Sequence, residues 1–129
     1  MKQLLALSVV VALAGCATKG DVRALPNDSG VAATYTASLE KARTCSRDSL
    51  AEAGFTVKED ETAGEPYWRL LATRGSTAQI ARVTIEDKKG SAVVRVIVRS
   101  RVDSREAVAG DLALAEDIQK RIGGRITKE

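Results

Sequence analysis

Hydrophobic and polar positions divide the chain into three parts. The first is an apolar block of ten residues, 4–13, which follows a single cation, Lys2. The second, from residue 17 to about 30, has no apolar periodicity and contains glycine, proline, asparagine and serine, so it predicts a flexible tether. From residue 31 onward, apolar side chains recur with the spacings of strands and helices, which predicts one folded domain over 31–129.

Two stretches of the domain have a helical period. Ser38 is a favourable N-cap for a helix over about 39–53, and Gly54 stands where a left-handed C-cap is expected. A second stripe predicts a helix that starts near residue 111 and ends at the glycine pair 123–124. The segment 103–110 stays open, because Asp103 and Glu106 can cap a helical turn whereas Gly110 weakens one. The two stripes are Leu39, Ala42, Ser46, Leu50 and Ala53, and Leu114, Ala115, Ile118 and Ile122.

The remaining apolar positions alternate with polar ones, as they do in strands. A short run at 31–36 precedes the first helix. Two short loops, 74–77 and 87–90, favour antiparallel hairpins. The order strand, helix, four strands, helix predicts an α+β fold in which an antiparallel sheet carries two helices on one face. The four strands after the first helix begin at 55–57 and continue with 67–73, 79–86 and 91–101.

Hairpin register decides which side chains share the second face of this sheet. With the loops at 74–77 and 87–90, Arg69 lies beside Arg82 and Arg82 beside Arg95. Like charges directly opposite one another are destabilising, so the row favours compensating anions, supplied by an acidic protein segment, an anionic lipid headgroup or a glycan phosphate. The alternative is a solvated face on which the arginine stems lie over the strands. The predicted interaction surface comprises Arg69, Arg82 and Arg95 with Leu71, Ile80, Ile97 and Tyr67.

Residues suited to catalysis or metal binding are scarce. The chain has no histidine, which excludes Ser-His-Asp catalysis and imidazole ligation of a metal, so we predict neither an enzyme nor a cofactor. Cys45 lies at the edge of the first helical stripe, where a free thiol is usually a small buried hydrophobe; an intermolecular disulfide is the alternative. An acidic cluster lacks the ligand spacing of a calcium loop and predicts a solvated loop. Its members are Glu59, Asp60, Glu61 and Glu65.

The end of the N-terminal apolar block resembles a known signal. Leu13-Ala14-Gly15-Cys16 resembles the lipobox of bacterial lipoprotein signal peptides. The block has the length of a signal h-region and is well short of the roughly 20 residues that span a bilayer. The resemblance implies that residues 1–15 are cleaved, that Cys16 is acylated and anchors the protein, and, because Ala17 follows, that the anchor lies in the outer membrane facing the periplasm. The alternative is an apolar N-terminal helix or strand buried in the domain.

Removal of Lys2 with such a signal peptide leaves 19 of the 20 basic residues against 17 acidic ones. A nearly balanced charge argues against a nucleic-acid partner, which usually requires a clustered basic surplus. The predicted organisation is therefore a signal peptide at 1–15, a lipidated N-terminus and tether at 16–30, and a single α+β domain at 31–129.

Two segments of the domain carry a further resemblance. The sequence at 38–42 leading to 50–57, and at 110–111 leading to 118–122, resembles small bacterial outer-membrane lipoproteins of unknown function and, more distantly, the helix-grip domains of the BamC lipoprotein of the β-barrel assembly machinery. The resemblance implies a non-enzymatic interaction module, an accessory to an outer-membrane assembly. The alternative is a small-ligand or lipid carrier with a groove between helices and sheet, for which the discriminating feature is a cavity beside small residues such as Ala42, Ala53, Ala81 and Ala115.

Overall fold

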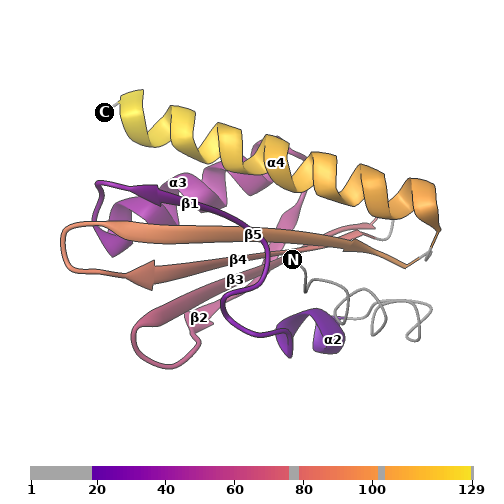
Figure 1. Ribbon diagram of the computed structural model, residues 1–129, viewed down its shortest axis with the longest axis horizontal. Coiled ribbons are helices and arrows are strands. Elements are labelled where there is room, and N and C mark those ends of the chain that lie inside the picture. The colour runs from indigo at the N-terminus through magenta and orange to yellow at the C-terminus, as the bar shows by residue number, and fades with distance from the viewer. Residues whose placement is uncertain (1–18, 76–78, 102–103, 129) are drawn as a thin grey trace, which may run out of the picture.

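The computed structural model describes residues 19–75, 79–101 and 104–128, and it has the predicted α+β fold. Its antiparallel sheet has five strands in the order β1-β5-β4-β3-β2 (Figure 1). The strands are β1 (Val31–Tyr35), β2 (Thr56–Thr62), β3 (Tyr67–Arg74), β4 (Gln79–Asp87) and β5 (Ala92–Ser100). The helices are α2 (Lys19–Arg23), α3 (Leu39–Glu52) and α4 (Arg105–Lys128). The first strand, whose place the sequence does not predict, lies at the edge beside β5.

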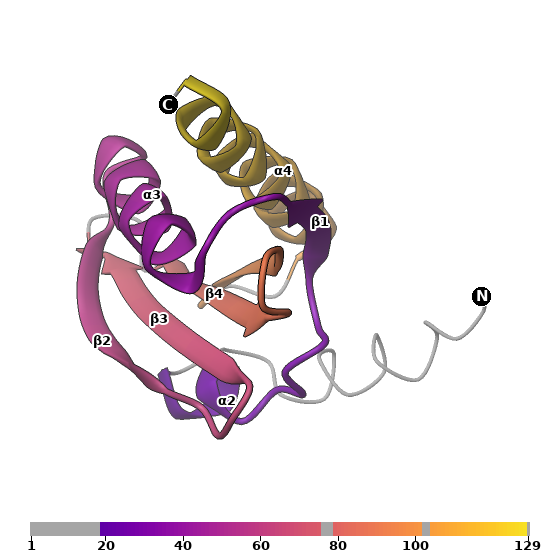
Figure 2. The ribbon, with the colours of Figure 1, turned by 90° about the vertical axis from the view of Figure 1, so that its left-hand side faces the viewer.

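Two of the helices cover one face of the sheet, as predicted. Figure 2 shows α3 and α4 on one side of it and α2 on the other. The α3 boundaries confirm the caps: the Ser38 side chain accepts a hydrogen bond from the Lys41 amide, and Gly54 has a φ of 93°. Because left-handed backbone is costly for residues with a Cβ, glycine suits this C-terminal position. The main core lies between the two layers and is built almost entirely from aliphatic side chains.

The last helix is longer at both ends than predicted. Ser104 accepts a hydrogen bond from the Ala107 amide, so the helix begins at Arg105 and passes through Gly110. It also runs through Gly123 and Gly124 to Lys128. Each interior glycine costs about 1 kcal/mol relative to alanine, but burial of apolar side chains in the last turns outweighs that cost. Beyond the glycine pair the buried side chain is Ile126, which continues the stripe of Ile118 and Ile122.

The sheet register differs from the predicted one by two residues. Arg74 pairs with Gln79 and Asp87 with Ala92, so each hairpin loop lies one residue later than predicted. Moving a loop by one residue moves every pair by two, which leaves each side chain on its predicted face. Leu70 thus faces Val83 instead of Ala81, and both still belong to the main core.

Residues 19–30 are not a flexible tether, and the prediction is wrong there. This segment, which we call the N-terminal strap, folds into α2 and packs on the face of the sheet opposite α3 and α4 (Figure 2). Val22 is 1% exposed, and it forms a second apolar cluster with residues from three strands. That cluster also contains Leu71, Ile80 and Ile97, with Leu25 packed against it. Of the segment predicted at 16–30, residues 16–18 lie outside the described residues.

Candidate interaction site

The three arginines predicted to form a row do not form one. In the observed register, Arg69 and Arg95 flank Thr84, whereas Arg82 lies one row away between Leu71 and Ile97. All of these side chains are on the predicted face. The pairing prediction was wrong because it placed both loops one residue too early.

Arg82 is fully buried beneath the N-terminal strap. Its guanidinium donates to the backbone carbonyls of Val22 at 3.1 Å, Leu25 at 2.6 Å and Pro26 at 2.8 Å. These carbonyls lie at the end of α2 and just beyond it, where a cation is favourable. The carbonyls of Val22 and Pro26 also accept hydrogen bonds from the amides of Leu25 and Ser29, whereas that of Leu25 depends on Arg82. Arg82 therefore fastens the strap to the centre of the sheet.

The Arg82 guanidinium remains charged although it is buried. Burial is the main cause that lowers the pKa of Arg82 to about 10, and the positive charges of Arg69 and Arg99 lower it further. The negative charge of Asp28 acts to raise this pKa. A pKa of about 10 is far above neutral pH, so the group is protonated when it binds the three carbonyls. Its Nε atom is buried and has no hydrogen-bond partner.

The other residues of the predicted surface are also engaged. Arg69 pairs with Glu61 at 2.7 Å, and Arg95 pairs with Glu86 at 3.0 Å. The Arg95 hydrogen bond holds the pKa of Glu86 below its usual range. Tyr67 is partly buried at the start of β3. Leu71, Ile80 and Ile97 are buried against the strap. The surface is therefore covered and largely neutralised from within, and it is not an open site for an acidic partner.

Most of the acidic cluster lies in an edge strand and not in a solvated loop. Three of its members, Glu59, Asp60 and Glu61, belong to β2. Glu59 binds Arg23 of the strap through both carboxylate oxygens, so the strap is fastened at the sheet edge as well as at its centre. Sequence reasoning missed this pairing because the two residues are 36 positions apart.

Asp60 links α3 to the sheet. Arg43 donates to both of its oxygens at 2.9 Å, and Arg47 and the Trp68 indole also donate to it. Burial alone would raise the pKa of Asp60, but these hydrogen bonds outweigh it and lower the pKa to about 2. The Arg43 guanidinium also lies 5.4 Å from the centre of the Trp68 ring, a cation–π distance. Asp60 is consequently a structural carboxylate.

No family model, curated protein or solved structure matches the chain. The resemblance to helix-grip domains remains a prediction. Within the described ranges, no three histidine, cysteine or acidic side chains are grouped so that they could hold a metal ion. No described helix is both long and apolar enough to cross a membrane.

The other residues singled out from the sequence lie in the main core or outside the described residues. Cys45 is buried in the main core, as a small hydrophobe should be. Ala42, Ala81 and Ala115 are buried in the same core and Ala53 packs against it, which favours close helix packing over a ligand groove. Cys16 and the signal peptide predicted at 1–15 lie outside the described residues. Only Ala17 and Thr18 separate Cys16 from the first residue of α2.

Two features near the opposite edge of the sheet were not singled out from the sequence. The edge strand β1 contains no charged residue and no proline. The neighbouring helix α4 exposes Val108 and Leu112 in its first turns, where Asp111 binds Ser100 at the end of β5. These two are 52% and 55% accessible and are the exposed large hydrophobic residues of the described chain. Their spacing of four residues fits one side of a helix, but the sequence alone did not show that α4 extends this far.

Proposed function

We propose that the protein is a lipid-anchored envelope protein of the outer membrane, attached through an acylated Cys16 and facing the periplasm. Its α+β domain acts as a non-enzymatic interaction module that lies directly on the membrane surface. The lipobox resemblance supports the anchor, and the packed N-terminal strap supports the position of the domain.

The observation that carries the position is the short distance between the anchor and the strap. A fully extended chain spans at most about 3.6 Å per residue, so the Lys19 Cα lies within about 11 Å of the Cys16 Cα. The strap itself is fastened to the sheet through Arg82 and Glu59. A flexible tether over 16–30 would hold the domain roughly 20 Å away on average, whereas the packed strap brings α2 to the level of the lipid headgroups.

Metabolic labelling with a clickable fatty acid tests the anchor. We expect the unmodified chain to be labelled and to fractionate with the outer membrane, and Cys16→Ser to be unlabelled. Equal labelling of the two chains would refute acylation at Cys16.

The position of the domain has its own test. We expect brominated lipids to quench a fluorophore on Ala24→Cys, which is exposed on the strap, more strongly than one on Thr44→Cys, which is exposed on α3. Both positions carry small uncharged residues, so the substitutions are matched. Equal quenching at the two positions would show that the α2 side does not face the membrane, even if Cys16 is acylated.

A further inference from the structure

We propose that the protein forms a symmetric dimer in which β1 pairs antiparallel with β1 of a second copy, giving a continuous ten-stranded sheet with the two α4 helices side by side. This inference goes beyond lipid anchoring and does not require it. The surface involved is the β1 edge together with the side of α4 that carries Leu112, Glu116 and Gly123.

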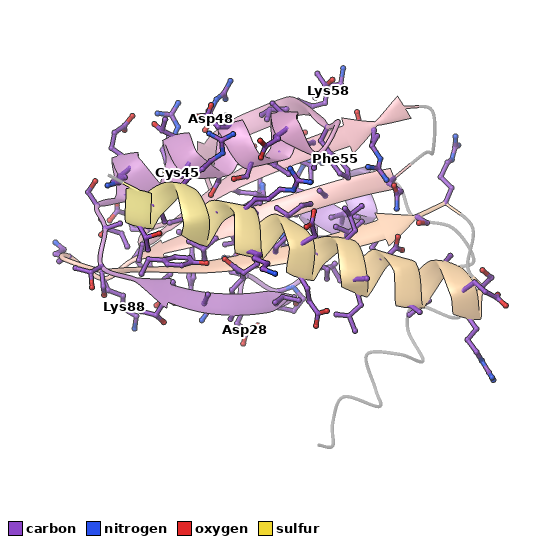
Figure 3. The ribbon with its side chains drawn as sticks, turned by 90° about the horizontal axis from the view of Figure 1, so that it is seen from above. Asp28, Cys45, Asp48, Phe55, Lys58 and Lys88 are labelled. Carbon is purple, nitrogen blue, oxygen red and sulfur yellow. The ribbon has the colours of Figure 1, made fainter. Side chains whose placement is uncertain are left out.

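The two edges of the sheet differ in how they oppose strand addition. At one edge, β2 has an irregular register between Val57 and Glu59 and carries charges from Lys58 to Glu61. Bulges and charges are the usual means of blocking an edge. At the other edge, the β1 sequence VAATY has neither. Figure 3 shows β1 at the outer edge of the sheet, with α4 beside it. The molecule protects one edge and leaves the other suited to pairing.

The β1 sequence is compatible with itself in an antiparallel pair centred on Ala33. Val31 would face Tyr35 of the second copy, and Ala32 would face Thr34. No like charges oppose one another in this register, and β-branched and aromatic residues form favourable cross-strand pairs. Ala32 and Thr34 are exposed in the single chain, so the pairing would bury surface that is now open.

The position of α4 suits this arrangement. Gln119 donates hydrogen bonds to the carbonyls of Val31 in β1 and Val94 in β5, at 2.8 and 2.9 Å, so α4 lies over these two strands. Strands are about 4.8 Å apart, and a helix above the gap between β1 and β5 would be roughly 10 Å from its symmetry mate. That separation is close to the usual distance between packed helices.

The residues on the outer side of α4 are complementary across the same axis. Three residues of α4 lie on the same side of the helix as Gln119, because their spacing from it is three, four or seven residues. They are Leu112 and Glu116, which precede Gln119, and Gly123, which follows it. With the axis near Gln119, Leu112 faces the last turns of the second α4. Glu116 comes close to Lys120 of the second copy, and symmetry makes this pair twice. Glu116 and Lys120 are both exposed in the single chain.

The same symmetry suits attachment to a single membrane. A two-fold axis through Ala33 is perpendicular to the sheet, so it keeps both α4 helices on one face and both straps on the other. The two N-termini therefore leave the dimer on the same side. Other ways of joining two copies, such as packing one helical layer on the other, would turn the straps away from each other.

Sedimentation of the full chain in detergent tests the dimer, with the charge pair as the probe. We expect the unmodified chain to sediment as two copies. Glu116→Lys and Lys120→Glu should each weaken association roughly tenfold, because each variant creates two like-charge contacts. The double variant should recover most of the lost affinity. Lys58→Glu, the same charge change on the exposed β2 edge, is the matched control and should have no effect.

Three outcomes would overturn the proposal: a single-copy mass for the unmodified chain, equal weakening by the Lys58 control, or no recovery in the double variant. A photo-crosslinker at Thr34 in intact cells identifies the occupant, since an adduct of twice the chain mass supports a second copy and an adduct with a different protein contradicts it. Cys16→Ser should still dimerise in detergent, which separates this proposal from acylation.

Discussion

Arg82→Met should detach the N-terminal strap while leaving the sheet and its two large helices folded. Methionine has a similar length and is apolar, so it fills much of the space but cannot donate to the carbonyls of Val22, Leu25 and Pro26. The substitution therefore tests the hydrogen bonds of Arg82 more than the volume of its side chain.

The expected magnitude follows from these contacts. If the strap stayed in place, only the Leu25 carbonyl would be left without a partner, at a cost of about 1–3 kcal/mol. The carbonyls of Val22 and Pro26 would keep the Leu25 and Ser29 amides as donors and would each lose one charged hydrogen bond, worth about 1.5–3 kcal/mol. Two effects limit the loss: the variant no longer buries a charge, and the carbonyls can bind water once the strap leaves the sheet. We therefore expect docking of the strap to weaken by about 2–4 kcal/mol, roughly 30- to 1,000-fold in its opening equilibrium.

Hydrogen exchange followed by mass spectrometry measures this opening locally. Amides in the strap should exchange faster in Arg82→Met, whereas amides in β5 should change little, because local opening and global unfolding are separate events. Arg95→Met is the matched control on the same face, since Arg95 pairs with Glu86 and does not contact the strap carbonyls. Unchanged strap protection in Arg82→Met, or an equal increase in β5, would refute the role assigned to Arg82.

Two further predictions concern the helical face. Because the folded pKa of Asp60 is about 2, below its usual 3.8, its ion pairs stabilise the domain fully above about pH 4 and progressively less as the pH falls toward 2. Asp60→Asn should therefore lower the free energy of unfolding by about 1–2 kcal/mol at pH 7 and converge with the unmodified chain near pH 2 in urea titrations; a pH-independent difference would contradict this. In α4, Gly124→Ala should stabilise by about 0.5–1 kcal/mol because its Cβ would enter open space. Gly123→Ala should gain less or destabilise, because its Cβ would lie 3.2 Å from the Tyr35 ring; equal thermal shifts for the two variants would show that Tyr35 yields freely.

The sequence predicts the fold well because the pattern of apolar and polar residues that encodes it is periodic. Strand alternation depends only on parity, so the faces of β3, β4 and β5 were correct even though every pair was displaced by two residues. Boundaries that depend on a single residue were less predictable. The glycine pair at 123–124 predicts a stop, but burial of Ile126 in the turn beyond it offsets the local cost of the glycines.

The packing of the N-terminal strap on the second face of the sheet was not predictable by the same reasoning. The strap contributes only Val22 and Leu25 to its apolar cluster, too few to produce a detectable period. Its charge pairing with Glu59 joins residues far apart in the chain. The available signal was Arg82 itself, the one charged residue between Ile80 and Ile85 of β4, because a charge at such a position must find buried partners.

Arg82 and the strap depend on each other. Without the strap, the arginine lies on an open sheet face among Leu71, Ile80 and Ile97, where water solvates it and those apolar side chains are exposed. Without the arginine, the strap would bury the Leu25 carbonyl with no donor, and the carbonyls of Val22 and Pro26 would keep only their hydrogen bonds from the Leu25 and Ser29 amides. The two costs are removed only together, so partial docking is unfavourable and the strap should bind or leave as a unit. A segment that docks in this way fixes which face of the domain its N-terminus leaves, and the proposed lipid anchor at Cys16, three residues before the strap, requires this property.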